Sequence, residues 1–163
     1  MSLQQQPDEV LSVRPIKTRI FREGENLFDF IVTQIDPRYI RESMILAITS
    51  KIVSLAENQL LDKKSIDKHK LIDDEADHNL GEVGYGCFLT IKEGLFIPSA
   101  GIDESNSESD RYILYPKDPF ASAQKICAQL KTHWGLKKLG VIITDSHTTP
   151  LRRGVTGISL SHW

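Results

Sequence analysis

The sequence predicts an α+β, or mixed α/β, fold in which a mixed β-sheet is flanked by helices. Three observations support this class. Hydrophobic residues make up 40% of the 163 residues, which is enough to build the core of one domain. Short apolar runs of strand length lie on both sides of one long segment with helical periodicity. Two of these runs are joined by a glycine-containing connection typical of a hairpin, which adds antiparallel pairs to possible parallel neighbours.

Each element of the first half has a local signal. Pro15 interrupts an extended segment, Asn26 caps a helix, and the pair Asp36-Pro37 ends that helix. The continuous apolar run 44–49 predicts a buried strand, after which the chain must turn at Ser50-Lys51. The expected order is a disordered tail at 1–10, the domain over 11–163 with an extended segment at 11–20, a helix at 27–35, a strand at 44–49, and one or two charged surface helices outside the core within 57–82.

Glycine and proline mark the boundaries of the second half. Gly81, Gly84 and Gly86 predict a loop, and Lys92-Glu93-Gly94 predicts the turn of a hairpin. Asp118-Pro119 supplies a cap and a first-turn proline for a helix whose apolar positions share one face. The expected order is a hairpin of strands 88–91 and 95–97, a loop at 104–110, a strand at 113–115, a helix that ends at Gly135, and strands at 139–144 and 155–160.

Charge and composition exclude two classes of partner. The 20 basic and 22 acidic residues give a formal charge of -2, so the whole molecule does not attract nucleic acid or anionic lipid. No apolar run approaches the roughly 20 residues that span a bilayer, and the start lacks the features of a secretory signal, so we expect a cytoplasmic protein. Cys87 and Cys127 lack the spacing of a zinc site and are expected to be inert thiols.

Two acidic residues follow apolar runs and suggest a metal site. Asp145 comes after the strand-like run 139–144, and Asp103 follows a second run at 95–102. Carboxylates delivered to the carboxyl edge of a sheet suit Mg²⁺, which takes one or two carboxylates together with waters and substrate phosphates. Ser146 and Asn106 could add an oxygen ligand or a hydrogen bond to a phosphate. The alternative is that both aspartates cap ordinary turns.

Other polar residues near these runs have a chemical and a plain interpretation. Arg152 could bind a phosphate or carboxylate with its planar guanidinium, or form a surface salt bridge. Ser50-Lys51 resembles a phosphate-binding turn but lacks the glycines of a P-loop. His147 could transfer protons, although a solvated loop histidine is the commoner case. The acidic cluster 73–78 is expected to be a solvated helix face.

Four ordered motifs resemble one protein family. They are Ile48-Thr49-Ser50-Lys51-Ile52-Val53-Ser54, the segment 99–106, Tyr115-Pro116-Lys117-Asp118-Pro119 and the segment that begins at Asp145. Together they resemble the gamma-glutamyl ligases that act on the deazaflavin coenzyme F420. The segments 145–152 and 71–77 are most similar to the bacterial branch of that family assigned to folate metabolism. The resemblance extends from about Arg14 onward.

The resemblance implies an enzyme, an acid–amino-acid ligase that depends on GTP and a divalent metal. Such an enzyme phosphorylates a substrate carboxylate, and the amine of L-glutamate then displaces phosphate to form an amide with a pterin- or deazaflavin-type acceptor. The implied metal is Mg²⁺ or Mn²⁺, with K⁺ as a further candidate ion, and the implied assembly is a homodimer. The implied residues are Asp103, Asp145 and Ser146 for metal, Lys17, Thr18, Arg19, Ile20, Ser50, Lys51 and Asn106 for nucleotide, and Lys51 and Arg152 for catalysis.

The sequence also departs from the family pattern. Leu55 stands where the F420 enzymes carry a second lysine, and residues 148–151 replace their Gly-Arg-Pro-Trp, which favours a folate-type acceptor. The family's domain continues beyond the position of Trp163, so we expect the chain to hold that domain without its C-terminal part. Two alternatives therefore stay open, a catalytically incomplete nucleotide-binding module and a metal-dependent phosphohydrolase.

Overall fold

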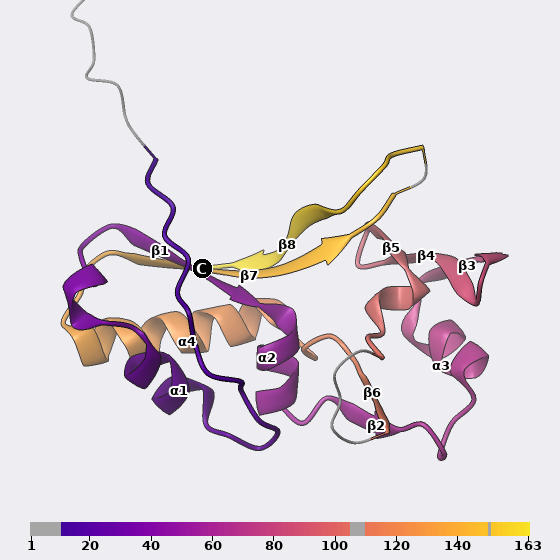
Figure 1. Ribbon diagram of the computed structural model, residues 1–163, viewed down its shortest axis with the longest axis horizontal. Coiled ribbons are helices and arrows are strands. Elements are labelled where there is room, and N and C mark those ends of the chain that lie inside the picture. The colour runs from indigo at the N-terminus through magenta and orange to yellow at the C-terminus, as the bar shows by residue number, and fades with distance from the viewer. Residues whose placement is uncertain (1–10, 105–109, 150) are drawn as a thin grey trace, which may run out of the picture.

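The computed structural model describes residues 11–104, 110–149 and 151–163, and it has the mixed α/β architecture that the sequence predicts (Figure 1). The predicted disorder of residues 1–10 lies outside this range. The helices are α1 (Leu27–Gln34), η1 (Pro37–Tyr39), α2 (Ser50–Ala56), α3 (Lys68–Glu75), η2 (Ser99–Gly101) and α4 (Pro119–Trp134). The strands are β1 (Met44–Thr49), β2 (Leu60–Asp62), β3 (His78–Gly84), β4 (Cys87–Lys92), β5 (Leu95–Pro98), β6 (Arg111–Ile113), β7 (Leu139–His147) and β8 (Thr156–His162).

The described strands form three separate sheets. The first has the order β1-β7-β8, with β1 and β7 parallel and β7 and β8 antiparallel, so it is a mixed sheet as predicted. Two antiparallel sheets, β2-β6 and β3-β4-β5, lie beside α3 on the other side of the molecule (Figure 1). The hairpin of β4 and β5 was predicted correctly.

Helix α4 organises the main core, and its signals in the sequence are confirmed. Asp118 caps it by accepting a hydrogen bond of 2.9 Å from the Ala121 N–H, and Gly135 ends it in the left-handed conformation. Helices α1 and α4 cover the same face of the first sheet (Figure 1). The fully buried side chains between α4 and β7 are Ala123, Cys127, Leu130, Val141 and Ile143. Among the described residues no helix is both long and apolar enough to cross a bilayer.

The prediction for residues 44–51 was wrong in two respects. Strand β1 is buried on one face only, and Ile45 on its other face is 63% exposed, because the helices cover one side of the sheet. The chain does not turn at Ser50-Lys51, where α2 begins directly after the strand. This helix was not predicted because it has only seven residues and because the Thr49 side chain makes no capping hydrogen bond.

The prediction for residues 57–84 was wrong in part. This stretch does contain a surface helix, but Leu71 and Ile72 of α3 are buried in the core at 2% and 0% exposure. Gly81 and Gly84 belong to β3 instead of a loop. Both take positive φ where the pairing with β4 shifts register, so they form bulges in the strand.

Strand β7 continues three residues past the predicted end at 144, because its pairing with β8 runs on to His147. Its parallel pairing with β1 ends at Thr49 and Thr144. Asp145 is therefore the first residue beyond the parallel pair, and it lies at the carboxyl edge where the sequence predicted it. Asp103 does not end a strand, because η2 separates it from β5. The strand predicted at 113–115 lies earlier, as β6.

Candidate functional site

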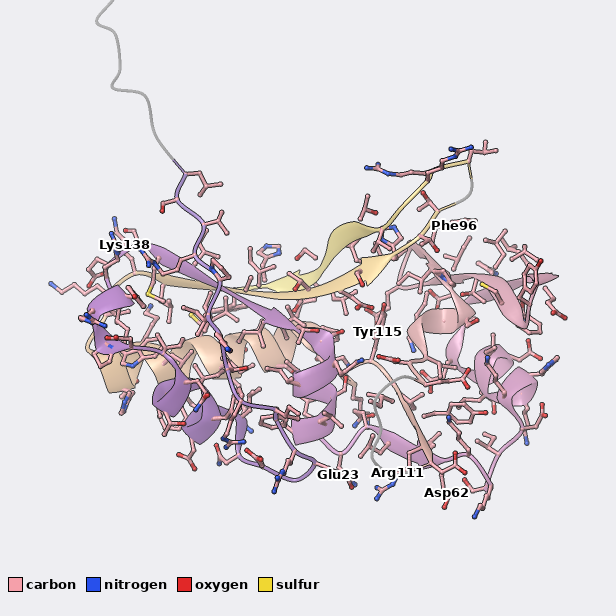
Figure 2. All side chains as sticks on the ribbon, viewed as in Figure 1. Glu23, Asp62, Phe96, Arg111, Tyr115 and Lys138 are labelled. Carbon is pink, nitrogen blue, oxygen red and sulfur yellow. The ribbon has the colours of Figure 1, made fainter. Side chains whose placement is uncertain are left out.

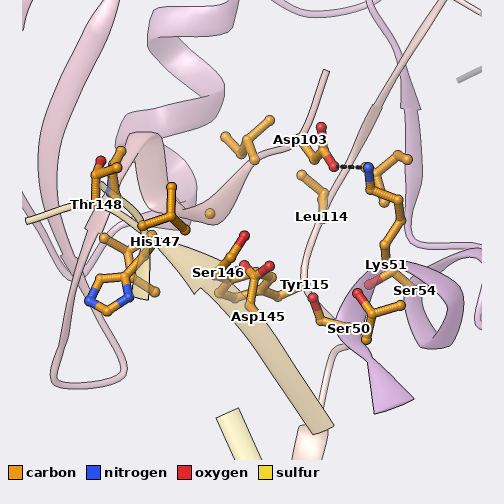
Figure 3. Close-up of a pocket in the computed structure, with 17 residues that line it drawn as sticks. Ser50, Lys51, Ser54, Asp103, Leu114, Tyr115, Asp145, Ser146, His147 and Thr148 are labelled. Carbon is orange, nitrogen blue, oxygen red and sulfur yellow. Dashed lines mark hydrogen bonds and ion pairs between the residues drawn. The ribbon is translucent and has the colours of Figure 1, made fainter. Parts of the chain in front are cut away.

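A cavity of about 450 Å³ lies where the first sheet meets the two other sheets (Figure 3). Its walls come from the β1–α2 junction, the β5–η2 connection, the residues after β6 and the end of β7. Five predicted site residues, from three separate segments of the chain, line it together: Ser50, Lys51, Asp103, Asp145 and Ser146. Ser54 and Tyr115 also line the cavity, and they were not predicted as site residues. His147, which was expected in a solvated loop, lies at the end of β7 and lines the cavity too.

An ion pair closes one end of the cavity. The Lys51 Nζ lies 2.5 Å from the Asp103 Oδ2, and the two side chains are 30% and 32% exposed (Figure 3). Lys51 is the second residue of α2, and Asp103 is held by two backbone hydrogen bonds of 2.9 Å with Ile113. The start of a helix and an isolated β-bridge therefore fix the two backbones that bring the ammonium and the carboxylate together at the cavity.

Tyr115 positions the second carboxylate. Its hydroxyl donates a hydrogen bond of 2.5 Å to the Asp145 Oδ2, and the tyrosine is 7% exposed. Tyr115 lies near the middle of the molecule, between the part that holds the first sheet and the part that holds α3 (Figure 2). Burial, together with the hydrogen bond to Asp145, raises the pKa of the phenol above its ordinary value. The hydroxyl therefore stays protonated around neutral pH and remains a donor to the carboxylate.

Replacing Tyr115 with phenylalanine is expected to lower the free energy of unfolding by about 1 kcal/mol at pH 7, because the Asp145 carboxylate loses a donor. The raised pKa of Tyr115 also makes the free energy of unfolding depend on pH. The unfolded tyrosine ionises near pH 10, so the stability that the neutral phenol contributes is present below that pH and falls as the pH rises above it. Urea unfolding from pH 7 to 11 should show a steeper alkaline loss for the wild type than for Tyr115→Phe, and parallel curves would contradict this account.

Gly101 makes room for the Tyr115 ring. It takes a φ of +73°, and a Cβ at this position would lie 2.4 Å from Cζ of Tyr115. Gly101→Ala is therefore expected to destabilise the protein by about 2 kcal/mol or more, since strained backbone adds to a displaced ring. Gly24→Ala is the matched control, because Gly24 has a φ of +75° with nothing within 4 Å. Equal losses of melting temperature for the two variants would contradict the clash.

The oxygen donors that line the cavity suit a divalent cation whose remaining coordination positions are filled by a bound ligand. Asp103, Asp145 and Ser146 supply two carboxylates and a hydroxyl, which are the hard oxygens that Mg²⁺ and Mn²⁺ prefer. Within residues 11–104, 110–149 and 151–163, no three His, Cys, Asp or Glu side chains are grouped to hold a metal by themselves. Phosphate oxygens and water would have to complete the coordination. The metal assignment stays a prediction.

Other predicted residues do not line this cavity. Arg152 is exposed on the connection between β7 and β8, and residues 17–20 are exposed in the segment before α1. Arg19 binds the Glu25 carboxylate at 2.6 Å. The segment that follows is tied to β6, because Arg111 lies 2.7 Å from Glu23 (Figure 2). The roles predicted for these residues stay predictions, and Asn106 falls outside the described residues.

Comparison with known proteins gives the family. The sequence model of the F420-0:gamma-glutamyl ligase family matches residues 15–163. The chain belongs to the F420-0:gamma-glutamyl ligase family. The family predicted from the four motifs is thereby confirmed, whereas the bacterial folate branch stays a prediction.

Several relatives of this F420-0:gamma-glutamyl ligase family member carry the name coenzyme F420:L-glutamate ligase. The Methanopyrus kandleri protein is 28% identical over 168 residues, which cover 92% of this chain and 65% of the relative. The Methanocaldococcus jannaschii protein is 31% identical over 160 residues, which cover 86% and 62%. The Archaeoglobus fulgidus protein is 41% identical over 75 residues, which cover 45% and 30%. The chain thus spans less than two thirds of the length of these relatives.

Proposed function

We propose that this chain carries the phosphate- and metal-binding part of a GTP-dependent ligase that joins L-glutamate to a coenzyme F420-type or folate-type acceptor. One observation carries the proposal. Lys51, Asp103 and Asp145, which three separate family motifs supply, line a single cavity in a chain whose relatives are named coenzyme F420:L-glutamate ligase. A cation and two carboxylates around one cavity suit a triphosphate and its divalent metal.

The residues divide into two groups by charge. Lys51, with the neighbouring Ser50 hydroxyl, would bind the phosphate oxygens and neutralise charge on the phosphoryl group during transfer. Asp103, Asp145 and Ser146 would hold Mg²⁺ or Mn²⁺. When bound, the metal supplies further neutralisation of the phosphate oxygens. Tyr115 keeps the Asp145 carboxylate in place before the metal arrives.

The proposed reaction has two steps. A carboxylate oxygen of the acceptor attacks the γ-phosphorus of GTP, the bond to the bridging oxygen breaks, and GDP leaves. The amine nitrogen of L-glutamate then attacks the acyl carbon of the resulting acyl phosphate, the carbon–oxygen bond breaks, phosphate leaves, and the amine gives up a proton. Neither step needs a covalent bond to the protein, so the chain contributes position and charge.

We also propose that the protein acts as a homodimer. The connection between β7 and β8 projects from the body of the molecule (Figure 1), and Leu151 and Val155 on this connection are 109% and 65% exposed. Apolar side chains on a projecting arm suit contact with a second copy. Such contact would also give Arg152 a route to a neighbouring cavity. Light scattering of the purified protein should give twice the mass of the chain.

The activity is tested by measuring phosphate release. The protein is incubated with GTP, Mg²⁺ or Mn²⁺ and L-glutamate, with a deazaflavin or pterin carboxylate as acceptor, and the amide product is detected by mass spectrometry. Release that needs both glutamate and acceptor supports the proposal. Release that needs neither would support a metal-dependent phosphohydrolase instead. GTP binding without any release would support a nucleotide-binding module.

A further inference from the structure

A buried hydroxyl on a residue that lines the cavity has no hydrogen-bond partner. Ser54 lies in α2 and is 1% exposed. Its Oγ is the one buried side-chain polar atom of the described residues for which the structure shows no hydrogen bond. Ser54 is also one of the residues that line the cavity (Figure 3), so a ligand in the cavity is a candidate for the missing partner.

Other buried hydroxyls of the described residues show how unusual this is. The Ser161 hydroxyl donates to the Pro119 carbonyl oxygen at 2.7 Å. The Ser122 hydroxyl donates to the Asp118 carbonyl oxygen at 2.9 Å, and the Thr90 Oγ1 accepts from the Ala100 N–H at 2.8 Å. A serine inside a helix can also donate to the carbonyl four residues back, and Ser54 does not do so. A buried polar group without a partner destabilises the fold, so its presence calls for an explanation.

The surroundings of Ser54 favour an anionic partner. Ser50 and Ser54 are one helical turn apart and therefore lie on the same face of α2. Both lie beside Lys51, whose ammonium supplies the positive charge at this end of the cavity (Figure 3). A hydroxyl next to an ammonium is well placed to donate to an oxyanion. Rotation about a single side-chain torsion is enough to turn the Oγ of a serine toward the cavity that it lines.

We propose that the Ser54 hydroxyl binds a phosphate oxygen of the nucleotide, next to the contact made by Lys51. This inference rests on the proposed function, because it takes the cavity to be the triphosphate site. The hydroxyl is left unsatisfied in the free protein and is satisfied by the ligand. Ser54 is therefore a binding residue that the sequence motifs had not singled out.

The test compares two buried serines that differ in their partners. Ser54→Ala removes an unsatisfied hydroxyl inside the cavity, whereas Ser161→Ala removes a satisfied one outside it at the same 1% exposure. We expect Ser54→Ala to keep or slightly raise the melting temperature of the free protein and to raise the Kd for Mg²⁺–GTP about five- to tenfold. We expect Ser161→Ala to lower the melting temperature by roughly 2–5 °C and to leave the Kd unchanged.

Calorimetry with inorganic tripolyphosphate, in place of GTP, shows whether the lost contact is to phosphate. The same five- to tenfold weakening for Ser54→Ala would support a phosphate contact. If Ser54→Ala leaves the Kd for GTP unchanged, the inference is overturned while the proposed function stands. The same holds if Ser54→Ala raises the Kd for GTP but leaves the Kd for tripolyphosphate unchanged. A lower melting temperature for Ser54→Ala would also overturn it, because the hydroxyl would then have a structural partner. A wild-type protein that binds no GTP would overturn the proposed function itself, and the inference with it.

Discussion

Replacing Lys51 with methionine is expected to lower the rate of GTP-dependent glutamate ligation by about 100-fold or more. The change removes the ammonium that would neutralise the transferring phosphoryl group, and it leaves Asp103 without the cation that lies 2.5 Å away. Methionine keeps a side chain of similar length, so α2 should still form. Initial rates at saturating glutamate and acceptor, with GTP varied, give kcat/KM for the variant and the wild type.

Lys125→Met is the control for this prediction. Lys125 is an exposed lysine of α4 that does not line the main cavity, so its loss changes the formal charge equally but should leave the rate unchanged. Circular dichroism of both variants checks that the fold is intact. Equal rates for Lys51→Met and the wild type would show that the phosphoryl group is transferred elsewhere in the protein.

Asp145→Asn is expected to weaken Mn²⁺ binding and to lower the ligation rate by about 100- to 1,000-fold. The substitution removes the charge that a divalent cation needs but keeps an oxygen that can accept from Tyr115, so the position of the side chain is preserved. Electron paramagnetic resonance measures free Mn²⁺ directly, in the presence of GTP, and separates metal loss from slower chemistry.

Asp74→Asn provides the comparison. Asp74 is an exposed carboxylate of α3 that lies outside the cavity, and its loss should change neither Mn²⁺ affinity nor rate. If Asp145→Asn binds Mn²⁺ as tightly as this control does, Asp145 is not a metal ligand and its carboxylate serves the contact with Tyr115 alone.

The elements that were predicted correctly are those with complete local signals. Helix α4 has an aspartate cap, a proline in its first turn, one apolar face and a glycine at its end. Helix α2 has none of these, since its cap makes no side-chain hydrogen bond and it includes the β-branched residues Ile52 and Val53. Strand β3 was missed because its two glycines are typical of loops, whereas pairing with β4 holds them in bulges.

The site was predictable to the extent that its residues belong to recognisable segments. Lys51, Asp103 and Asp145 each follow an apolar run, and the structure places all three around one cavity. Tyr115 could not be found in this way, because its role depends on contact with a residue thirty positions later in the sequence. Ser54 was not predicted as a site residue because α2 was not predicted, and because only the packed structure shows that its hydroxyl has no hydrogen-bond partner.

The contact between Lys51 and Asp103 has a consequence for the order of binding. A nucleotide without its metal would draw the Lys51 ammonium away from the Asp103 carboxylate, and a metal without nucleotide would draw the carboxylate away from the ammonium. Each ligand should therefore bind more tightly once the other is present, and linkage requires the two enhancements to be equal. If the cavity is the nucleotide site that we propose, it would then favour the preformed metal–nucleotide complex over either component alone.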